Sequence, residues 1–471
     1  ERLARLTDDE IAVLMEDPGI IRNRLKLKAV RQNAQAWLKL EDPVALLWSF
    51  VGGTPKINHF SERSQVPALT PEAEAMSKAL KKLGFTFADM HGEPYWDETS
   101  AYRLTLRQVE DDIEDPATAL HAMCREAVAH AVTSEEWMTR LEIPRPHWDF
   151  VERSWSNGEP ELYGRFDLAY DGKGPAKLLE YNADTPTSLY ESASFQWLWF
   201  EESRDAGVLA PQSDQFNRIH EALVERWAEI CAPGEDVHFA ADRDNPEDYA
   251  TVEALAWAAR EAGLGAHFTA LNGIGITDEG QLADEDDRVI GTLFKLYPWE
   301  DMLRDDFAAH LQSSGTRFIE PPWKAVLSNK GILPLLWQIA PGHPNLLPAF
   351  FLDDVRDALT GGSPAPAVAE SFATAEAGLR AGHVTKPIFS REGAGVTITE
   401  NGRTTAETGD DSYSHHPMIV QGLAPLPEFD GFHPVVGAWI VGEACCGIGL
   451  REDRARITHN LSRFKPHFIE G

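Results

Sequence analysis

The residues with the clearest potential for chemistry lie in two short runs joined by a glycine-containing turn. Arg165 and Asp167 are two positions apart, and Glu180 and Asn182 repeat that spacing. Because alternate side chains of a strand face the same side, the two pairs would meet if the runs form adjacent strands. Three oxygen ligands without sulfur suit Mg²⁺, and the neighbouring arginine suits an anionic group. A β-hairpin with a solvated charged face is the alternative, and spacing alone favours it.

A second run, VTKPIFSREGAGV at residues 384–396, combines charge with glycine. A strand that ends near Lys386 would enter a turn that carries Arg391, Gly393 and Gly395. Lysine offers phosphate a point charge, and glycines let backbone N–H groups approach it. The Walker pattern GxxxxGK[ST] is absent, and an ordinary hairpin is the commoner explanation of such a segment.

Two further runs could complete a nucleotide site. MIVQGLAPLP at residues 418–427 is an apolar strand followed by a turn, and it could present backbone groups to an adenine edge. In GIGLREDRARIT, Arg451 ends a strand and could face a transferred phosphate. A plain core strand and a surface arginine are the respective alternatives.

The elements that must position these residues alternate between helix and strand after Gly92, which favours an α/β or α+β fold with a substantial sheet. The stretch 357–380 is rich in Ala, Gly, Ser and Pro, so we expect a flexible insertion there. The pattern predicts helices over 117–132, 216–231 and 249–262, and strands over 176–181, 238–241, 289–296, 418–421 and 435–441.

The first 90 residues have a different character and predict a small all-α segment. Helices are expected from the cap at Thr7 to Gly19, over residues 20–40 and over 67–82. This segment carries 13 Lys/Arg against 12 Asp/Glu, whereas the rest carries 30 against 63. The strong negative charge of the chain after residue 90 repels nucleic acid and favours cationic partners.

Composition excludes several classes of protein. Four scattered cysteines are too few for a disulfide framework and indicate reduced thiols, so we expect a cytoplasmic protein. The sequence contains no run of 18 or more apolar residues, so no membrane span is predicted. The chain opens with Glu1 and has no apolar signal region, which favours a fragment of something longer.

Long blocks between about residue 86 and residue 471 resemble the glutathionylspermidine synthase-like ATP-grasp ligases. The blocks include GFTFADMHGEPYWDETSAYRLT, LYGRFD, LLEYNADTPTSLYE, EPPWKAVLSNKGILPLLW, KPIFSREGAGV and SRFKPHF. The resemblance implies an ATP-grasp domain with a pre-ATP-grasp domain. It also implies an amide-forming C–N ligase, in which ATP phosphorylates a carboxylate and an amine attacks the resulting acyl-phosphate.

The same resemblance implies a role for each candidate residue. Asp167, Glu180 and Asn182 would hold Mg²⁺. The others would bind ATP (Lys330, Lys386, Gln421 and Leu423), act on the phosphoryl or acyl-phosphate group (Arg165, Arg391 and Arg451) or bind the substrate (Thr185, Thr187 and Glu247).

The substrates stay open because the chain departs from the family pattern near its substrate residues. Thr185 and Thr187 replace serines, and Pro246 precedes Glu247 where polyamine-binding members have adjacent glutamates. The N-terminal cysteine amidase of bifunctional members is absent. The departures indicate a single-domain branch that joins a peptide-like acid to an amine or polyamine, with neither substrate identified.

The N-terminal segment resembles another family. LWSFVGGTPKINH and VPALTPEAEAMSKALKKLGFTF are similar to the C-terminal half of bacterial 3-methyladenine DNA glycosylases. The half with the catalytic acid and base pocket is missing, which predicts that residues 1–85 are a remnant or fusion segment before a ligase at 86–471. A DNA-repair or DNA-binding protein, and a nucleotide-binding but inactive ATP-grasp protein, are the alternative functions.

Overall fold

The computed structural model describes residues 2–7, 10, 24–40, 42–52, 76, 79–80, 83, 89–90, 93–243, 245–391, 393–409, 412–459 and 462–470. Two compact units make up the chain, Glu1–Trp96 and Asp97–Gly471. Most of the predicted helices over 7–19 and 67–82 lies outside the described residues.

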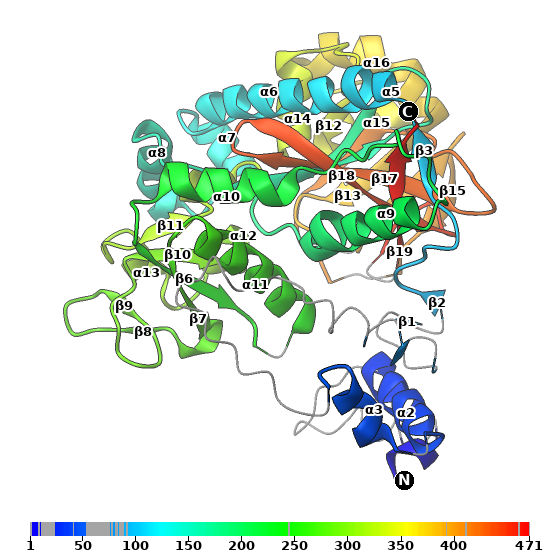
Figure 1. Cartoon of the computed structure of the whole chain (residues 1–471). Coiled ribbons are helices and arrows are strands. Elements are labelled where there is room, and N and C mark those ends of the chain that lie inside the picture. The colour runs from blue at the N-terminus through cyan, green and yellow to red at the C-terminus, as the bar shows by residue number, and fades with distance from the viewer. Residues whose placement is uncertain are drawn as a thin grey trace. The chain divides into compact units, whose positions relative to one another are not determined.

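The first unit is built from short helices (Figure 1). Asp42 accepts a hydrogen bond from the Ala45 amide and begins α3, with Pro43 in the first turn. Gln35 donates from α2 to the Ala4 carbonyl at 2.9 Å, which ties α2 to the preceding turn. The elements are η1 (Leu3–Arg5), α2 (Arg24–Leu38), α3 (Pro43–Ser49) and the antiparallel strands β1 (Asp89–Met90) and β2 (Glu93–Pro94). The helix predicted over 20–40 is confirmed for residues 24–38.

One antiparallel sheet of the second unit carries the charged strand pair. Its strand order is β19-β18-β17-β4-β5. Glycine at position 437 in β17 leaves room for Arg165 of β4, because a Cβ there would lie 2.9 Å from the arginine Cδ. The strands are β4 (Tyr163–Ala169), β5 (Lys177–Asn182), β17 (His433–Val441), β18 (Ala444–Asp453) and β19 (Arg463–Lys465).

A second antiparallel sheet has the order β12-β16-β13-β14-β15. Side chains of two of its strands reach the first sheet: Lys386 donates to the Leu179 carbonyl and Gln421 to the Leu178 carbonyl, each at 2.9 Å. The strands are β12 (Ala349–Phe351), β13 (Gly382–Pro387), β14 (Thr397–Glu400), β15 (Arg403–Glu407) and β16 (Met418–Gly422).

The prediction of a flexible insertion over 357–380 is wrong. The chain there forms the end of α15 (Leu352–Leu359) and then α16 (Ala369–Ala381). Phe372, Ala375 and Leu379 recur at helical spacing and are buried in the larger hydrophobic core. The many alanines that favoured a loop are also the strongest helix formers, and the apolar face decides between the two outcomes.

A third, parallel sheet has the order β11-β10-β6-β7 and is covered by α10 and α11 (Figure 1). Side chains of this sheet and of the helices form a separate core cluster, which includes Trp227 of α10 and Phe239 of β6. The elements are α10 (Ile219–Ile230), β6 (Asp236–Ala241), α11 (Pro246–Glu261), β7 (Gly265–Ala270), β10 (Thr292–Lys295) and β11 (Arg317–Ile319). The expected mixture of helices and strands is therefore confirmed.

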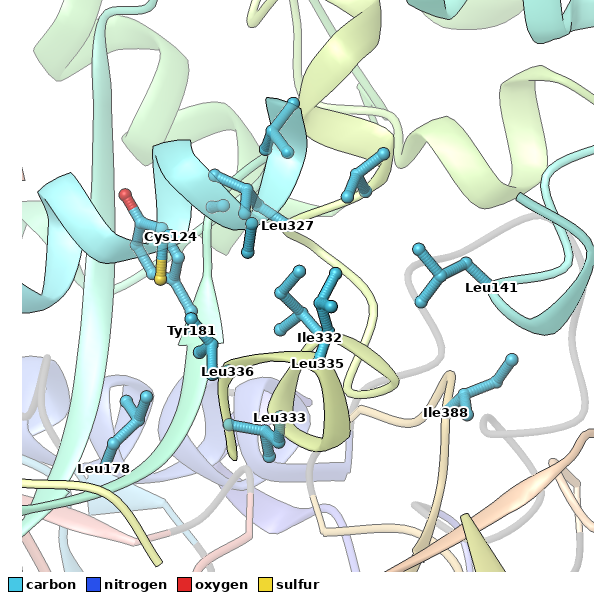
Figure 2. Packing of buried hydrophobic residues seen from close by; sticks show 14 of the residues in the cluster. Cys124, Leu141, Leu178, Tyr181, Leu327, Ile332, Leu333, Leu335, Leu336 and Ile388 are labelled. Atoms are coloured by element: carbon cyan, nitrogen blue, oxygen red, sulfur yellow. The ribbon is translucent and has the colours of Figure 1, made fainter. Parts of the chain in front are cut away.

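The larger core lies among α6 (Asp115–Ala131), α14 (Ile332–Ile339) and the two antiparallel sheets. Figure 2 shows leucines of α14 gathered with Cys124 of α6 and Tyr181 of β5. All four cysteines are buried and unpaired. In the described part of the chain, no helix has the length and apolar character that crossing a membrane requires.

Shorter elements complete the second unit. Parallel strands β3 (Tyr102–Leu104) and β20 (His467–Ile469) join its two ends. The others are α5 (Leu106–Val109), η3 (Glu110–Glu114), α7 (Glu135–Arg140), η4 (Arg145–His147), α8 (Trp148–Ser156), η5 (Glu191–Phe195), α9 (Gln196–Asp205), η6 (Leu271–Gly273), β8 (Gly275–Ile276), β9 (Leu282–Ala283), α12 (Trp299–Met302), α13 (Ala308–Leu311), η7 (Pro322–Ala325) and η8 (Pro366–Val368).

Candidate functional site

The two charged runs form the adjacent strands that their spacing predicts. In the antiparallel pairing of β4 with β5, Asp167 stands opposite Glu180 and Arg165 opposite Asn182. The Asn182 amide nitrogen donates to both carboxylates, at 3.3 Å to Asp167 and 3.3 Å to Glu180. Four side chains that sequence spacing placed on one face are thus in mutual contact.

Arg165 is the buried cation of this group, with only 8% of its side chain exposed. Its Nε and Nη2 donate to the two oxygens of Asp167 at 2.7 and 3.2 Å, and its Nη1 donates to the Thr187 carbonyl at 2.6 Å. The guanidinium also lies over the Trp439 ring, 5.6 Å from its centre. Arg165 is therefore fixed in position, and Thr187 contributes its backbone rather than its hydroxyl to this contact.

Two lysines converge on Glu180. The Lys330 Nζ lies 3.1 Å from a Glu180 oxygen and also donates to the Ser390 carbonyl at 2.8 Å. Burial raises the pKa of Glu180, but the charges of Lys330 and Lys386 and the hydrogen bonds to it outweigh burial and lower the pKa to about 2. Burial lowers the pKa of Lys386 to about 8, with Glu180 opposing. Glu180 is thus held as a carboxylate beside two cations.

A cavity lies beside these lysines, and we name it the Lys386 cavity. Gln421 is only 1% exposed, and its side-chain amide donates to the Leu178 carbonyl. Because β16 pairs with β12 on one side and β13 on the other, the cavity-lining segment that follows β16, which begins at Leu423, is what remains to meet a ligand. Six predicted site residues line the cavity: Asp167, Glu180, Lys330, Lys386, Gln421 and Leu423.

The glycine-containing turn after β13 closes the Lys386 cavity on one side. Gly393 and Gly395 both have positive φ, at 75° and 67°, a conformation that favours glycine. A Cβ on Gly393 would also lie 2.6 Å from the Thr458 carbonyl oxygen. The glycines predicted to let the backbone approach phosphate are therefore required by the turn itself.

A much smaller neighbouring cavity of about 10 Å³, the Arg451 cavity, has room for about one water and is lined by Arg165, Asp167 and Arg451 among others. Arg451 donates from Nη2 to the His459 carbonyl at 2.8 Å, while its buried Nε has no hydrogen-bond partner in the described residues. Asp167 lines both cavities, so Arg451 and the two lysines lie on either side of the same carboxylate.

Arg391 lies near the strand pair but faces another cavity. Its guanidinium is 3.4 Å from the Thr185 hydroxyl and 3.5 Å from a Glu300 oxygen, and it lines the Glu300 cavity, defined by Glu142, Arg145, Glu300, Arg304 and Arg391. The sequence did not single out Glu300, whose position in the short run YPWE carries no periodic signal.

Glu247 is the most separate of the predicted site residues. It lies in the first turn of α11, which Asn245 caps by accepting hydrogen bonds from the amides of Glu247 and Asp248. Among the described residues, it lines none of the three cavities above. Its charge nevertheless acts on this region: burial lowers the pKa of Arg165, and the charges of Asp167, Glu180 and Glu247 together raise it above its usual value.

Sequence reasoning also missed the buried charges that hold the start of β4. Lys324 lies 2.7 Å from Glu320 and 3.0 Å from Glu161, and donates to the Tyr163 carbonyl at 2.7 Å. Glu320 accepts a hydrogen bond from the Tyr163 amide at 2.9 Å, and burial raises its pKa to about 7. Charged residues inside the apolar run EPPWKAV were the available signal.

This combination of sheets, carboxylates and converging cations is typical of proteins that bind phosphorylated ligands. Residues 68–470 match the family model for the glutathionylspermidine synthase preATP-grasp, which spans most of the chain. The chain therefore belongs to the glutathionylspermidine synthase preATP-grasp family. Residues 1–91 match the family model for the methyladenine glycosylases.

Known relatives fall into the same two groups. A Haemophilus influenzae protein described as a candidate acid–amine ligase is 37% identical over 411 residues, covering 85% of this chain and 98% of that protein. Trypanothione synthetase of Crithidia fasciculata is 29% identical over 373 residues, covering 72% of this chain and 52% of that protein. DNA-3-methyladenine glycosylase 1 of Escherichia coli is 39% identical over 90 residues, covering 18% of this chain and 48% of that protein.

The relatives that match most of the chain are ligases and synthetases, which supports an amide-forming ligase. The chain spans only about half of the trypanothione synthetase and about half of the glycosylase.

Proposed function

We propose that residues 86–471 form an ATP- and Mg²⁺-dependent ligase that joins a carboxylate to an amine through an acyl-phosphate. ATP would transfer its terminal phosphoryl group to the carboxylate, and the amine would then displace phosphate. The observation that carries this proposal is the position of Asp167. It stands between the Lys386 cavity and the Arg451 cavity and contacts Arg165 directly.

The strand pair fits a magnesium ion. Asp167, Glu180 and the amide oxygen of Asn182 would hold the ion, because hard oxygen donors suit Mg²⁺ and few protein ligands are needed. The Asn182 amide nitrogen faces both carboxylates in the structure, so a half-turn of the amide would present its oxygen instead. Bound Mg²⁺ would neutralise phosphate charge, which phosphoryl transfer requires.

The remaining residues would bind and orient the nucleotide. Lys330 and Lys386 would contact phosphate oxygens, while Gln421 of β16 and Leu423 just after it would lie at the adenine. Arg165, Arg391 and Arg451 would stabilise negative charge on the group in transfer, since positioned cations are the main protein contribution to such reactions.

The substrate classes, a peptide-like acid and an amine or polyamine, are proposals that the family resemblance supports. An acyl-phosphate route requires an acid and an amine, and Thr185, Thr187 and Glu247 are the residues that we propose bind these substrates. We propose a peptide-like acid as the acyl donor.

The experiment that tests this function measures ADP release by the full chain with ATP and Mg²⁺. Pairs of peptide acids and amines are added, and the products are identified by mass spectrometry. We expect ADP release to depend on both substrates and the product mass to equal their sum less one water. ATP turnover that ignores both substrates would contradict a ligase.

A second candidate function rests on the match of residues 1–91 to the methyladenine glycosylases. It predicts binding to alkylated duplex DNA. Since the chain covers 48% of the Escherichia coli enzyme, a complete glycosylase activity is not what we propose. Titration of an alkylated duplex into the full chain distinguishes the candidates, because salt-sensitive micromolar binding is expected only for the second.

A further inference from the structure

The Glu300 cavity lies on the opposite side of the turn after β13 from the Lys386 cavity. Ser390 and Gly393 line the Lys386 cavity, whereas Phe389 and Arg391 line the Glu300 cavity. Its volume of about 720 Å³ is in the range of sites that hold small organic molecules. Arg391 also reaches Thr185, three residues beyond Asn182 at the end of β5. A ligand in this cavity would therefore approach the strand pair from the side away from the lysines.

Glu300 supplies a polar group that lacks a partner. One carboxylate oxygen faces Arg391 at 3.5 Å, while the other is buried and has no hydrogen-bond partner among the described residues. Burial raises the pKa of Glu300, with Arg391 opposing. Because the side chain is 15% exposed, the oxygen that faces Arg391 is the acceptor that a hydrogen-bond-donating ligand in the cavity would meet. A positively charged amine forms a charge-assisted hydrogen bond with a carboxylate, which is about twice as strong as a hydrogen bond between neutral groups.

Acidic and basic side chains around the cavity are balanced in number, which does not favour a polycation. Three acids line it, Glu142, Glu300 and Asp301, and three arginines, Arg145, Arg304 and Arg391. His415 and His416 also line it, and the His416 ring lies 2.7 Å from Glu142. This balance contrasts with the 75 Asp/Glu against 43 Lys/Arg of the whole chain. A ligand with positive charge along its whole length would gain little from so neutral a lining.

Glu300 and Arg145 also differ in how deeply their side chains are buried. The Glu300 side chain is 15% exposed, whereas the Arg145 side chain is 70% exposed and stacks on Trp148 with 4.5 Å to the ring centre. The exposed Arg304 is held in place, because it donates to the carbonyls of Glu300 and Glu142 at 2.5 and 2.6 Å. The cavity thus offers an anion at depth and cations nearer solvent.

We propose that the Glu300 cavity binds the acceptor amine, and that this acceptor is an amino acid or a small peptide rather than a polyamine. Its ammonium group lies against Glu300, and its own carboxylate lies toward Arg304 and Arg145. The role of this ligand as an acceptor rests on the proposed ligase function, but its binding can be measured without turnover.

The test uses the full chain with Mg²⁺ and a non-hydrolysable ATP analogue, titrated with glycylglycine or with spermidine at physiological salt and followed by ligand-observed NMR. Glycylglycine should bind more tightly than spermidine. Glu300→Gln should weaken glycylglycine binding about tenfold or more, since a charge-assisted hydrogen bond is lost. The exposed Glu370→Gln in α16 is the matched control and should change nothing.

Charge reversal at the mouth of the cavity separates the two ligand classes. Arg145→Glu should weaken glycylglycine binding and strengthen spermidine binding, so that the preference between them narrows or inverts. Tighter binding of spermidine by the unaltered protein, or unchanged glycylglycine binding in both variants, would overturn the proposal. Failure of ADP release with every acid and amine would count against the ligase function and leave these binding results standing.

Discussion

Glu180 is the residue on which two lysines converge, and its pKa of about 2 keeps it charged at any working pH. If it holds Mg²⁺, Glu180→Gln removes the charge while keeping the shape. We expect turnover to fall by about 100-fold or more, as for other losses of transition-state electrostatics, with the fold retained. ADP release and circular dichroism together check this. Wild-type turnover in the variant would remove Glu180 from the site, and Asp167→Asn tests the opposite strand in the same way.

Lys386 and Arg451 lie on either side of Asp167, and we expect their substitution to change different kinetic constants. A lysine that meets phosphate in the ground state and the transition state alike affects binding, so Lys386→Ala should raise the KM for ATP about tenfold. Arg451, whose buried Nε lacks a hydrogen-bond partner among the described residues, should act on charge that develops during transfer, so Arg451→Ala should mainly lower kcat. Steady-state kinetics give both constants, and the reverse pattern would exchange the two roles.

The lowered pKa of Lys386 predicts a pH dependence of nucleotide binding. Burial stabilises the neutral amine and brings the pKa to about 8, so the lysine is charged below that pH and neutral above it. Phosphate favours the charged form, so Mg·ATP affinity should be highest below about pH 8 and fall as pH rises through that value. Calorimetry across this range should show the inflection in the unaltered protein and lose it in Lys386→Met. An identical profile in the variant would assign the inflection to another group.

At the scale of elements, the site depends on how β4 begins. Lys324 is fully buried between Glu161 and Glu320 and holds the Tyr163 carbonyl, two residues before Arg165. Removing it leaves the buried Glu320 carboxylate without a counter-charge among the described residues and leaves Glu161 only its contacts with Arg125 and His121. Lys324→Ala should therefore lower the free energy of unfolding by about 3–5 kcal/mol.

Urea unfolding followed by tryptophan fluorescence measures this loss. The control is Arg356→Ala, because Arg356 and Asp353 form an exposed pair, with side chains 62% and 84% exposed. That change should lower stability by less than about 1 kcal/mol. Equal losses in the two variants would mean that the buried cluster does not stabilise β4.

At the scale of the whole molecule, the matches to two families overlap between residues 68 and 91, while the compact units divide at Trp96. We predict that a chain starting at residue 86 folds and binds Mg·ATP as the full chain does, because it retains every residue assigned to ATP and metal. Calorimetry on both chains measures this. A soluble truncated chain without nucleotide binding would contradict the modular arrangement.

A longer truncation serves as the comparison. Asp97 lies 2.8 Å from both Arg463 and Lys465, and β3 pairs with β20 near the C-terminus. A chain starting at residue 106 loses both connections and should be markedly less stable. Equal stability of the two truncated chains would show that the segment 97–105 is dispensable.

The sequence by itself determined the features that depend on local periodicity. Arg165, Asp167, Glu180 and Asn182 share a face because side chains alternate along a strand, and a short turn leaves the two runs little choice but to pair. The glycines after β13 were recognisable for a similar reason, since the turn needs positive φ. The long blocks that resemble the family could also be recognised in the sequence, and the family match confirms this resemblance.

Only the tertiary structure decided what depends on contacts between distant segments. Whether 369–381 is a loop or a helix was settled by the core that receives Phe372 and Leu379. Glu300 faces Arg391 across 91 residues of sequence, and Lys324 reaches Tyr163 across 161. A lone Glu or Lys in an apolar run has no periodic signal, because its partner is chosen by packing rather than by spacing.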